Sequence, residues 1–122
     1  MITIPELNKL ELALQIRARE LARSLAERNQ IMIERSADDF DRRLDAADRD
    51  SSAQALAGNL RLLRQVEAAR DRIRDGTYGA CLRCEEDIPL KRLQAIPWAG
   101  LCISCQKADE RRAFWPRLAR AA

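Results

Sequence analysis

The residues best suited to chemistry in this sequence are four cysteines, in two Cys-x2-Cys pairs separated by 17 residues: Cys81 with Cys84, and Cys102 with Cys105. Each pair places two sulfur atoms on one tight turn, and two such turns can supply four thiolates to a tetrahedral zinc ion, with Zn–S distances of ~2.3 Å. Protein then fills every coordination position, so the spacing predicts one structural Zn²⁺ with no place for an activated water. Two disulfides or an iron–sulfur cluster are the alternatives that the spacing leaves open.

The rest of the composition argues against an enzyme. The chain has no histidine, and the sequence shows no acid–base pair that would serve a pocket. The N-terminal residues carry charges and lack a signal-peptide core, and no apolar run approaches the ~20 residues needed to span a bilayer. We therefore expect a cytoplasmic protein without a membrane segment. Thiols stay reduced in the cytoplasm, where clustered cysteines serve as metal ligands.

Ahead of the cysteines, apolar residues recur every three or four positions, which predicts helices over residues 5–37 and 43–75. Pro5 suits a first helical turn, and Gly76 suits the position after a last turn. The first seam consists of Leu7, Leu14, Ala18, Leu21, Leu25 and Met32, and the second of Ser52, Ala55, Asn59, Leu62, Val66, Ala69 and Ile73. Neither helix has enough apolar residues to stand alone, so the two should pack as an antiparallel coiled-coil hairpin with arms roughly 50 Å long.

The predicted fold is therefore all-α, with two parts. Residues 1–75 form the coiled-coil hairpin, with an acidic tip near residues 38–48. Residues 76–122 form a small four-cysteine zinc-finger module followed by a short C-terminal helix. We expect that helix to weaken before Pro116 and to pack Phe114 and Trp115 against the module or the base of the hairpin.

The segment between the two predicted helices is acidic, because residues 38–50 contain six aspartates and three arginines. Asp38 and Asp41 are repeated seven residues later as Asp45 and Asp48. Aspartate favours turns and helix N-caps, so a solvated turn is the simple interpretation. The alternative is an acidic tip that acts far from the zinc module, on a metal ion or a basic partner. A turn at 38–41 leaves arms of equal length, which favours Asp38 and Asp41 as the tip.

The cysteine segment resembles the zinc-finger signature of the DksA/TraR family. The residues that carry the resemblance are the four cysteines and Gly76, Thr77, Tyr78, Gly79, Ile88, Pro89, Arg92, Leu93, Ala95, Pro97, Leu101 and Ile103. A long helical hairpin ahead of the finger is what longer family members have. The resemblance implies a bacterial or phage transcription regulator that binds core RNA polymerase and has no direct sequence-specific contact with DNA. We expect it to act as a monomer.

In that family the hairpin enters the secondary channel of the polymerase and carries an Asp-x-x-Asp-x-Ala tip towards the active site. Aligned without gaps from the first cysteine, the tip aspartates correspond to Asp38 and Asp41. The alanine position is then Arg43, or Asp50 if the second aspartate pair is the tip. The resemblance makes Arg43 and Arg92 candidate contacts to the polymerase.

Two further departures from the family pattern lie in and beside the finger. Glu85 follows Cys84 where the family usually has glycine, so we expect a left-handed backbone there at a cost of roughly 1 kcal/mol. Basic residues that bind guanosine tetraphosphate in some members are replaced by Gln65, Ile96 and Gln106. The resemblance therefore implies an action independent of that nucleotide.

Two other functions compete with the polymerase regulator. The first is an adaptor, in which the zinc module and hairpin bind another protein and the aspartates only form a turn. The second is a nucleic-acid binder using Arg111, Arg112, Arg117 and Arg120. An acidic arm is repelled by phosphates, and Tyr78 and Trp98 are expected in the core, so this second alternative is disfavoured.

Overall fold

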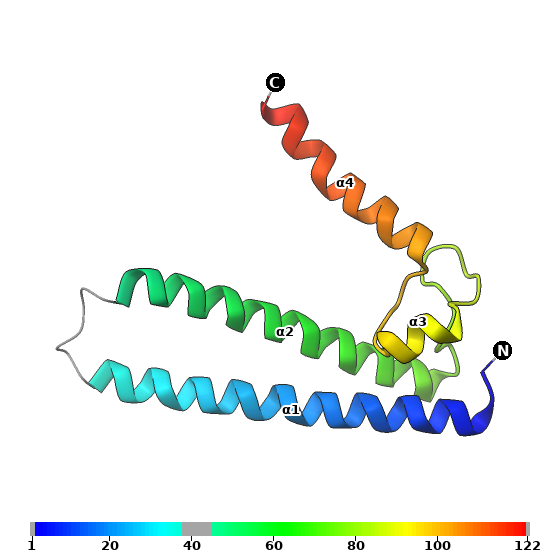
Figure 1. Ribbon diagram of the computed structural model, residues 1–122, viewed down its shortest axis with the longest axis horizontal. Helices are drawn as coiled ribbons and strands as arrows, with labels where there is room; N and C mark the ends of the chain where they lie inside the picture. The colour runs from blue at the N-terminus through cyan, green and yellow to red at the C-terminus, as the bar shows by residue number, and fades with distance from the viewer. Residues whose placement is uncertain (1, 38–44, 122) are drawn as a thin grey trace.

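The computed structural model describes the backbone of residues 2–37 and 45–121, and the side chains of residues 2–31, 34 and 50–113. It contains four helices: α1 (Ile4–Ala37), α2 (Asp45–Asp75), α3 (Leu90–Ala95) and α4 (Ile103–Ala121). α1 and α2 run antiparallel, side by side, as a long hairpin (Figure 1). The cysteine loops and α3 lie at the end where α1 begins. These described residues form no β-strand, only one antiparallel bridge between Ala80 and Asp87, which confirms the all-α fold.

The two helix ends next to the zinc module, the start of α1 and the end of α2, are both capped. The backbone N–H of Thr3 donates to Glu6 Oε2 at 2.9 Å, and the N–H of Glu6 donates back to Thr3 Oγ1 at 3.3 Å. This reciprocal pair is a capping box at the start of α1. The first-turn position expected for Pro5 is confirmed as well.

α2 ends in the way that the sequence predicts. Gly76 has φ +75°, and its N–H donates to the carbonyl of Ile73, while the N–H of Thr77 donates to the carbonyl of Arg72. These two bonds form a Schellman motif, which requires a left-handed residue that glycine supplies without strain. The chain therefore leaves α2 in a defined direction towards the first cysteine.

Buried apolar residues form two clusters. The hairpin cluster joins Leu14, Ala18 and Leu21 of α1 to Val66 and Ala69 of α2. All five belong to the predicted seams. The other seam positions behave differently: Ser52 and Ala55 are exposed, and Leu7 and Leu25 are only partly covered. The predicted seam is therefore wrong along the first turns of α2, because serine and alanine offer too little apolar area to hold the helices together.

The finger cluster contains Cys81, Ile88, Leu93 and Ala99 from the zinc module, together with Leu10 from α1. Leu10 is only 5% exposed, although the sequence seam skipped it. It reaches the module because the first turns of α1 extend beyond the hairpin cluster, to the end of the hairpin where the module lies. α1 thus contributes to both cores and ties the hairpin to the module.

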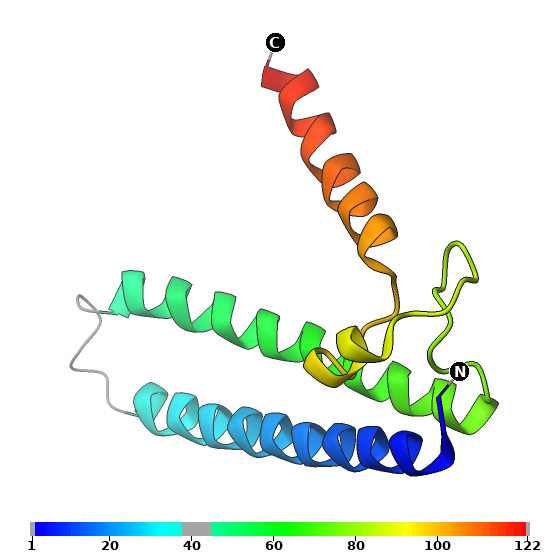
Figure 2. The same cartoon turned by 45° about the vertical axis from the view of Figure 1, so that its right-hand side comes forward.

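α4 is longer than expected and continues through Pro116 to Ala121, rising away from the hairpin (Figures 1 and 2). The expectation that it weakens before Pro116 is wrong. Proline removes one backbone donor, but alanine, arginine and leucine on both sides are strong helix formers. The side chains of Phe114 and Trp115, whose packing the sequence predicted, lie outside the described residues.

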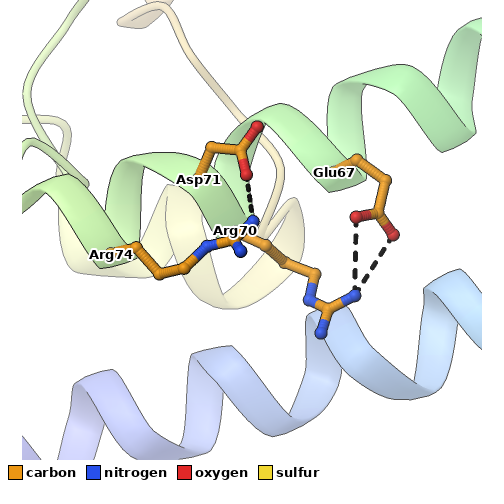
Figure 3. Close-up of polar contacts among 4 residues, drawn as sticks. All are labelled: Glu67, Arg70, Asp71 and Arg74. Carbon is orange, nitrogen blue, oxygen red and sulfur yellow. Dashed lines mark hydrogen bonds and ion pairs between the residues drawn. The ribbon is translucent and has the colours of Figure 1, made fainter.

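α2 carries ion pairs between residues three positions apart. Glu67 accepts from Arg70 at 3.2 Å, and Asp71 pairs with Arg74 (Figure 3). In each pair the acid precedes the base, the order that suits the helix dipole. Such exposed pairs contribute little to stability, so the fold depends on the two apolar clusters. In the part of the chain described here, no helix combines the length and apolar character needed to cross a bilayer.

Candidate metal centre and hairpin tip

The structure brings the four cysteines into one cluster, with all four Sγ atoms within 4.8 Å of one another. Cys84 Sγ and Cys102 Sγ are 3.8 Å apart, and none of the four is in a disulfide. Four sulfurs at ~2.3 Å from a tetrahedral zinc ion stand about 3.8 Å from each other, whereas a disulfide requires about 2.05 Å. The donor set and its spacing therefore fit a tetrahedral metal, and the disulfide alternative is excluded.

The first cysteine pair is held by a tight turn. The N–H of Cys81 donates to the carbonyl of Glu86 at 2.8 Å, and the N–H of Glu85 donates back to the carbonyl of Cys81 at 3.0 Å. Closing this turn requires a left-handed residue after Cys84. Glu85 adopts φ +65°, as predicted from its place in the glycine position. The cost of about 1 kcal/mol is small beside the free energy of binding a structural zinc ion.

The second pair connects the finger to α4. Cys102 lies just before Ile103, where α4 begins, and Cys105 lies in its first turn. The N–H of Cys102 points at Cys81 Sγ at 3.4 Å, and the N–H of Leu82 donates to the carbonyl of Gly100 at 2.8 Å. These hydrogen bonds connect the two knuckles to each other. An ion pair between Arg83 and Asp109 joins the first knuckle to α4.

The surroundings of the sulfurs favour a bound cation. Backbone N–H groups of Cys84 and Cys102 lower the pKa of Cys81 to about 6, so this thiol ionises readily. The neighbouring sulfur of Cys102, together with burial, raises the pKa of Cys105 to about 12. Sulfurs this close cannot all carry negative charge on their own, because each thiolate opposes ionisation of the next. A divalent cation removes that conflict, and with zinc all four serve as thiolate ligands.

Only some of the residues predicted for the tip belong to the part of the chain that the structure describes. Asp38, Asp41 and Arg43 lie outside the described residues. Asp45 is the first residue of α2 and Asp48 lies in its first turn, so the backbone of this second aspartate pair is helical. Carboxylates in a first helical turn stabilise the positive end of the helix dipole. α1 ends at Ala37 and α2 begins at Asp45.

A cleft of about 540 Å³ lies where α2, the finger and α4 meet. Its walls include Gln65, Ile96 and Gln106, the three positions on which the predicted independence of guanosine tetraphosphate rests. Gln106 Nε2 donates to Glu110 Oε1 at 3.2 Å, which adds a carboxylate to the same wall. Arg92 also lines the cleft, half-buried, and its Nε donates to the carbonyl of Leu101 at 3.1 Å.

Sequence reasoning missed several residues that hold the site together. Leu10 follows Leu7 by three residues and precedes Leu14 by four, so helical spacing could have placed it in the seam, which omitted it. The roles of Arg72 and Tyr78 depend on contacts with residues 97–99, which no local pattern reveals. The Thr3–Glu6 capping box did carry a signal, since Thr-x-x-Glu ahead of an apolar stretch predicts a helix start.

Comparison with known proteins agrees with this geometry. The family model described as the prokaryotic dksA/traR C4-type zinc finger matches residues 76–111. The RNA polymerase-binding transcription factor DksA of Caulobacter vibrioides is 39% identical over 75 aligned positions, and the alignment covers 56% of this chain and 53% of that protein. The chain spans only 28% to 53% of the lengths of the curated relatives it matches.

Solved structures match over nearly the whole chain. The transcription factor DksA2 from Pseudomonas aeruginosa has a TM-score of 0.72 and 24% identity, covering 91% of this chain and 88% of that one, so it shows the fold. The DnaK suppressor protein from Agrobacterium tumefaciens has a TM-score of 0.59 and 31% identity, covering 88% of this chain and 95% of that one.

The finger match and the four converging sulfurs assign one structural zinc ion to Cys81, Cys84, Cys102 and Cys105. The Caulobacter vibrioides and Pseudomonas aeruginosa relatives are named as transcription factors. The finger model, the curated relatives and the solved structures agree, and the chain belongs to the DksA/TraR family.

Proposed function

We propose that the protein is a transcription factor that binds core RNA polymerase and extends its hairpin into the secondary channel of the enzyme. The observation that carries the proposal is the shape of the hairpin. Two helices of 34 and 31 residues run from the zinc module to helix ends at Ala37 and Asp45, which flank the aspartate-rich segment (Figure 1). A stiff rod of this kind can deliver charge down a narrow pore, and the zinc module provides its base.

Within this proposal, Asp38 and Asp41 form the tip that approaches the catalytic centre of the polymerase. Asp45 and Asp48 are the second choice, because their backbone already lies in the first turn of α2. The test compares two double variants. The first carries Asp38→Asn and Asp41→Asn together, and its matched control carries Asp45→Asn and Asp48→Asn together. Both are measured in transcription with purified components and in polymerase binding. The first double variant should bind normally and lose the transcriptional effect. An unchanged effect in that variant moves the tip to the second pair or ends the tip proposal.

Polymerase binding is tested by co-purification of the zinc-loaded protein with core RNA polymerase, competed by another factor that occupies the channel. We expect capture, loss of capture in the presence of the competitor, and loss after zinc is removed with a chelator. Arg43→Ala and Arg92→Ala examine the two proposed polymerase contacts. An intact, zinc-loaded protein that fails to bind polymerase would favour the adaptor function instead.

We also propose that the action is independent of guanosine tetraphosphate. The support comes from the cleft, where Gln65, Ile96 and Gln106 supply no positive charge. Two arginines do line the cleft, but Arg72 and Arg92 donate to backbone carbonyls of the module. A polyanion such as guanosine tetraphosphate gains little binding free energy in a site with few cations, because its binding depends on attraction between opposite charges. Transcription assays with and without the nucleotide should give the same promoter effect, and a clear gain with the nucleotide would contradict this part of the proposal.

The rest of the proposal concerns the roles of the two parts of the chain, its location and its oligomeric state. Residues 1–75 act as the channel-entering hairpin and residues 76–122 as the zinc-centred base. The protein works in the cytoplasm as a monomer, without catalysis and without sequence-specific DNA binding. Light scattering of the zinc-loaded protein tests the monomer, and titration with DNA fragments of unrelated sequence tests the last point.

A further inference from the structure

The zinc module meets the end of the hairpin through Tyr78. This residue follows the Schellman motif that closes α2, and its ring packs against both the hairpin cluster and the finger cluster. Its hydroxyl donates to the carbonyl of Pro97 at 2.7 Å. Burial raises the pKa of Tyr78 to about 12, so the hydroxyl keeps its proton at physiological pH. The side chain therefore makes a permanent polar contact from the end of α2 to a loop of the module.

Arg72, in the last turn of α2, makes a second contact to the same loop. Its guanidinium donates to the carbonyl of Ala99 at 3.5 Å, and its own carbonyl accepts the N–H of Tyr78 at 3.2 Å. The side chain is half-buried, and burial lowers its pKa. Arg72 and Tyr78 are therefore linked to each other through the backbone and to the loop through their side chains.

Residues 97–99 alternate between hydrogen bonds and an apolar contact. The carbonyl of Pro97 accepts from Tyr78, the side chain of Trp98 packs against the hairpin cluster, and the carbonyl of Ala99 accepts from Arg72. Ala99 itself belongs to the finger cluster. Residues 97–99 are thus attached by two hydrogen bonds, one to Arg72 in the last turn of α2 and one to Tyr78, whose own N–H is bonded to Arg72, with an apolar contact between them.

Apolar contacts and hydrogen bonds have different effects at the joint between the hairpin and the zinc module, which is formed by Arg72, Tyr78 and residues 97–99. Apolar contacts such as those of Trp98 and Leu10 hold two parts together but are non-directional, so they permit small rotations. Hydrogen bonds weaken steeply as their angle departs from linear, so two of them at separate points restrict rotation. We propose that the Tyr78 hydroxyl and the Arg72 guanidinium are positioning groups that set the angle between the hairpin and the zinc module.

A small rotation at this joint produces a large displacement at the far end of the hairpin. From Asp75 to Gln54 the helix rises about 32 Å at 1.5 Å per residue, so a rotation of about 10° moves that position by on the order of 5 Å. A change at the joint that leaves both clusters intact therefore displaces the far end of the hairpin. This inference concerns geometry and does not depend on which partner the hairpin enters.

The experiment measures the distance between two spin labels by pulsed electron paramagnetic resonance in the zinc-loaded, full-length chain. The labels are attached to unnatural amino acids at Gln54 of α2 and Lys91 of α3, both exposed, so that the cysteines stay on zinc. The variants are Tyr78→Phe, which keeps the ring, Arg72→Met, and the two combined. Arg74→Met is the matched control, because Arg74 lies on the same helix and pairs only with Asp71 among the described contacts.

We expect zinc content and helicity to stay at wild-type levels in all variants. The combined variant should shift or broaden the distance distribution by on the order of 5 Å, with smaller effects in the single variants and none in the control. Arg72→Lys should restore part of the narrow distribution. An unchanged distribution in the combined variant overturns the proposal. So does loss of zinc or helix in Tyr78→Phe, because the hydroxyl would then be required for folding rather than for the angle.

Discussion

The side chain of Ile2 closes over Gly79, with its Cδ1 atom 2.7 Å from the position that a β-carbon on Gly79 would occupy. Gly79 also has φ +90°, and its carbonyl accepts the N–H of Ile88 at 2.7 Å. The N-terminal residues therefore seal the first turn of the zinc module. This contact exists only because α1 and the module meet at the base of the hairpin.

Gly79→Ala should destabilise the module. The left-handed backbone strains any L-residue, and the added methyl group must also displace the terminal Cδ1 atom of Ile2, so we expect a loss of about 1–2 kcal/mol. Gly76→Ala is the matched control, because Gly76 is also left-handed but has nothing within 4 Å of an added β-carbon. It should lose only about 1 kcal/mol. Chemical denaturation of the zinc-loaded proteins gives both values, and equal losses would show that the Ile2 contact is unimportant.

Leu10→Ala should weaken the zinc module although Leu10 lies in α1. Truncating a buried leucine costs about 2–5 kcal/mol, because the cavity is only partly refilled. Leu12→Ala serves as the control, since Leu12 lies on the same helix and is 56% exposed. We expect faster release of zinc to a chelator from Leu10→Ala than from the control. Equal release rates would mean that α1 does not support the finger cluster.

The ionisation of Tyr78 reports directly on the joint, because the chain contains one tyrosine. Its absorbance should titrate near pH 12 in the folded protein and near 10 after unfolding in denaturant. The unfolded state then releases the proton first, so this residue's contribution to stability is complete below pH 10 and declines as the pH rises towards 12. The decline should reach about 1–2 kcal/mol once solvent screening is allowed for, and should be absent from Tyr78→Phe. A folded-state midpoint near that of the unfolded chain would place the ring in solvent.

Removal of zinc should unfold the module while the hairpin stays paired at low temperature. Cys81 belongs to the finger cluster, whereas the buried residues of the hairpin cluster include no cysteine. The helical signal in circular dichroism should therefore fall by no more than the share of α3 and α4, which have 6 and 19 residues. Cys84→Ser should give the same partial loss. Zinc affinity should drop as the pH falls, since the thiolates take up protons. Collapse of the whole helical signal on chelation would show that the hairpin depends on the metal.

Local chemistry explains why much of the candidate site could be predicted. Two Cys-x2-Cys turns determine a four-sulfur centre wherever the intervening loop lies, because each turn builds its own half. The left-handed Glu85 follows from the same turn, and the end of α2 follows from Gly76. Within each of these turns the interacting groups lie within a few residues in the chain, so the sequence contains the whole local interaction.

Contacts between distant segments could not be predicted in this way. The sequence alone determined the zinc ligands, the two long helices and the aspartate-rich segment between them. Only the tertiary structure decided that Leu10 joins the finger core, that Tyr78 and Arg72 hold residues 97–99, and that Gln65, Ile96 and Gln106 share one cleft. Helical periodicity shows which face of α1 is apolar but not where along that face the zinc module will sit. That position depends on the direction in which the chain leaves α2 and on the shapes of two cores that form only when the segments meet.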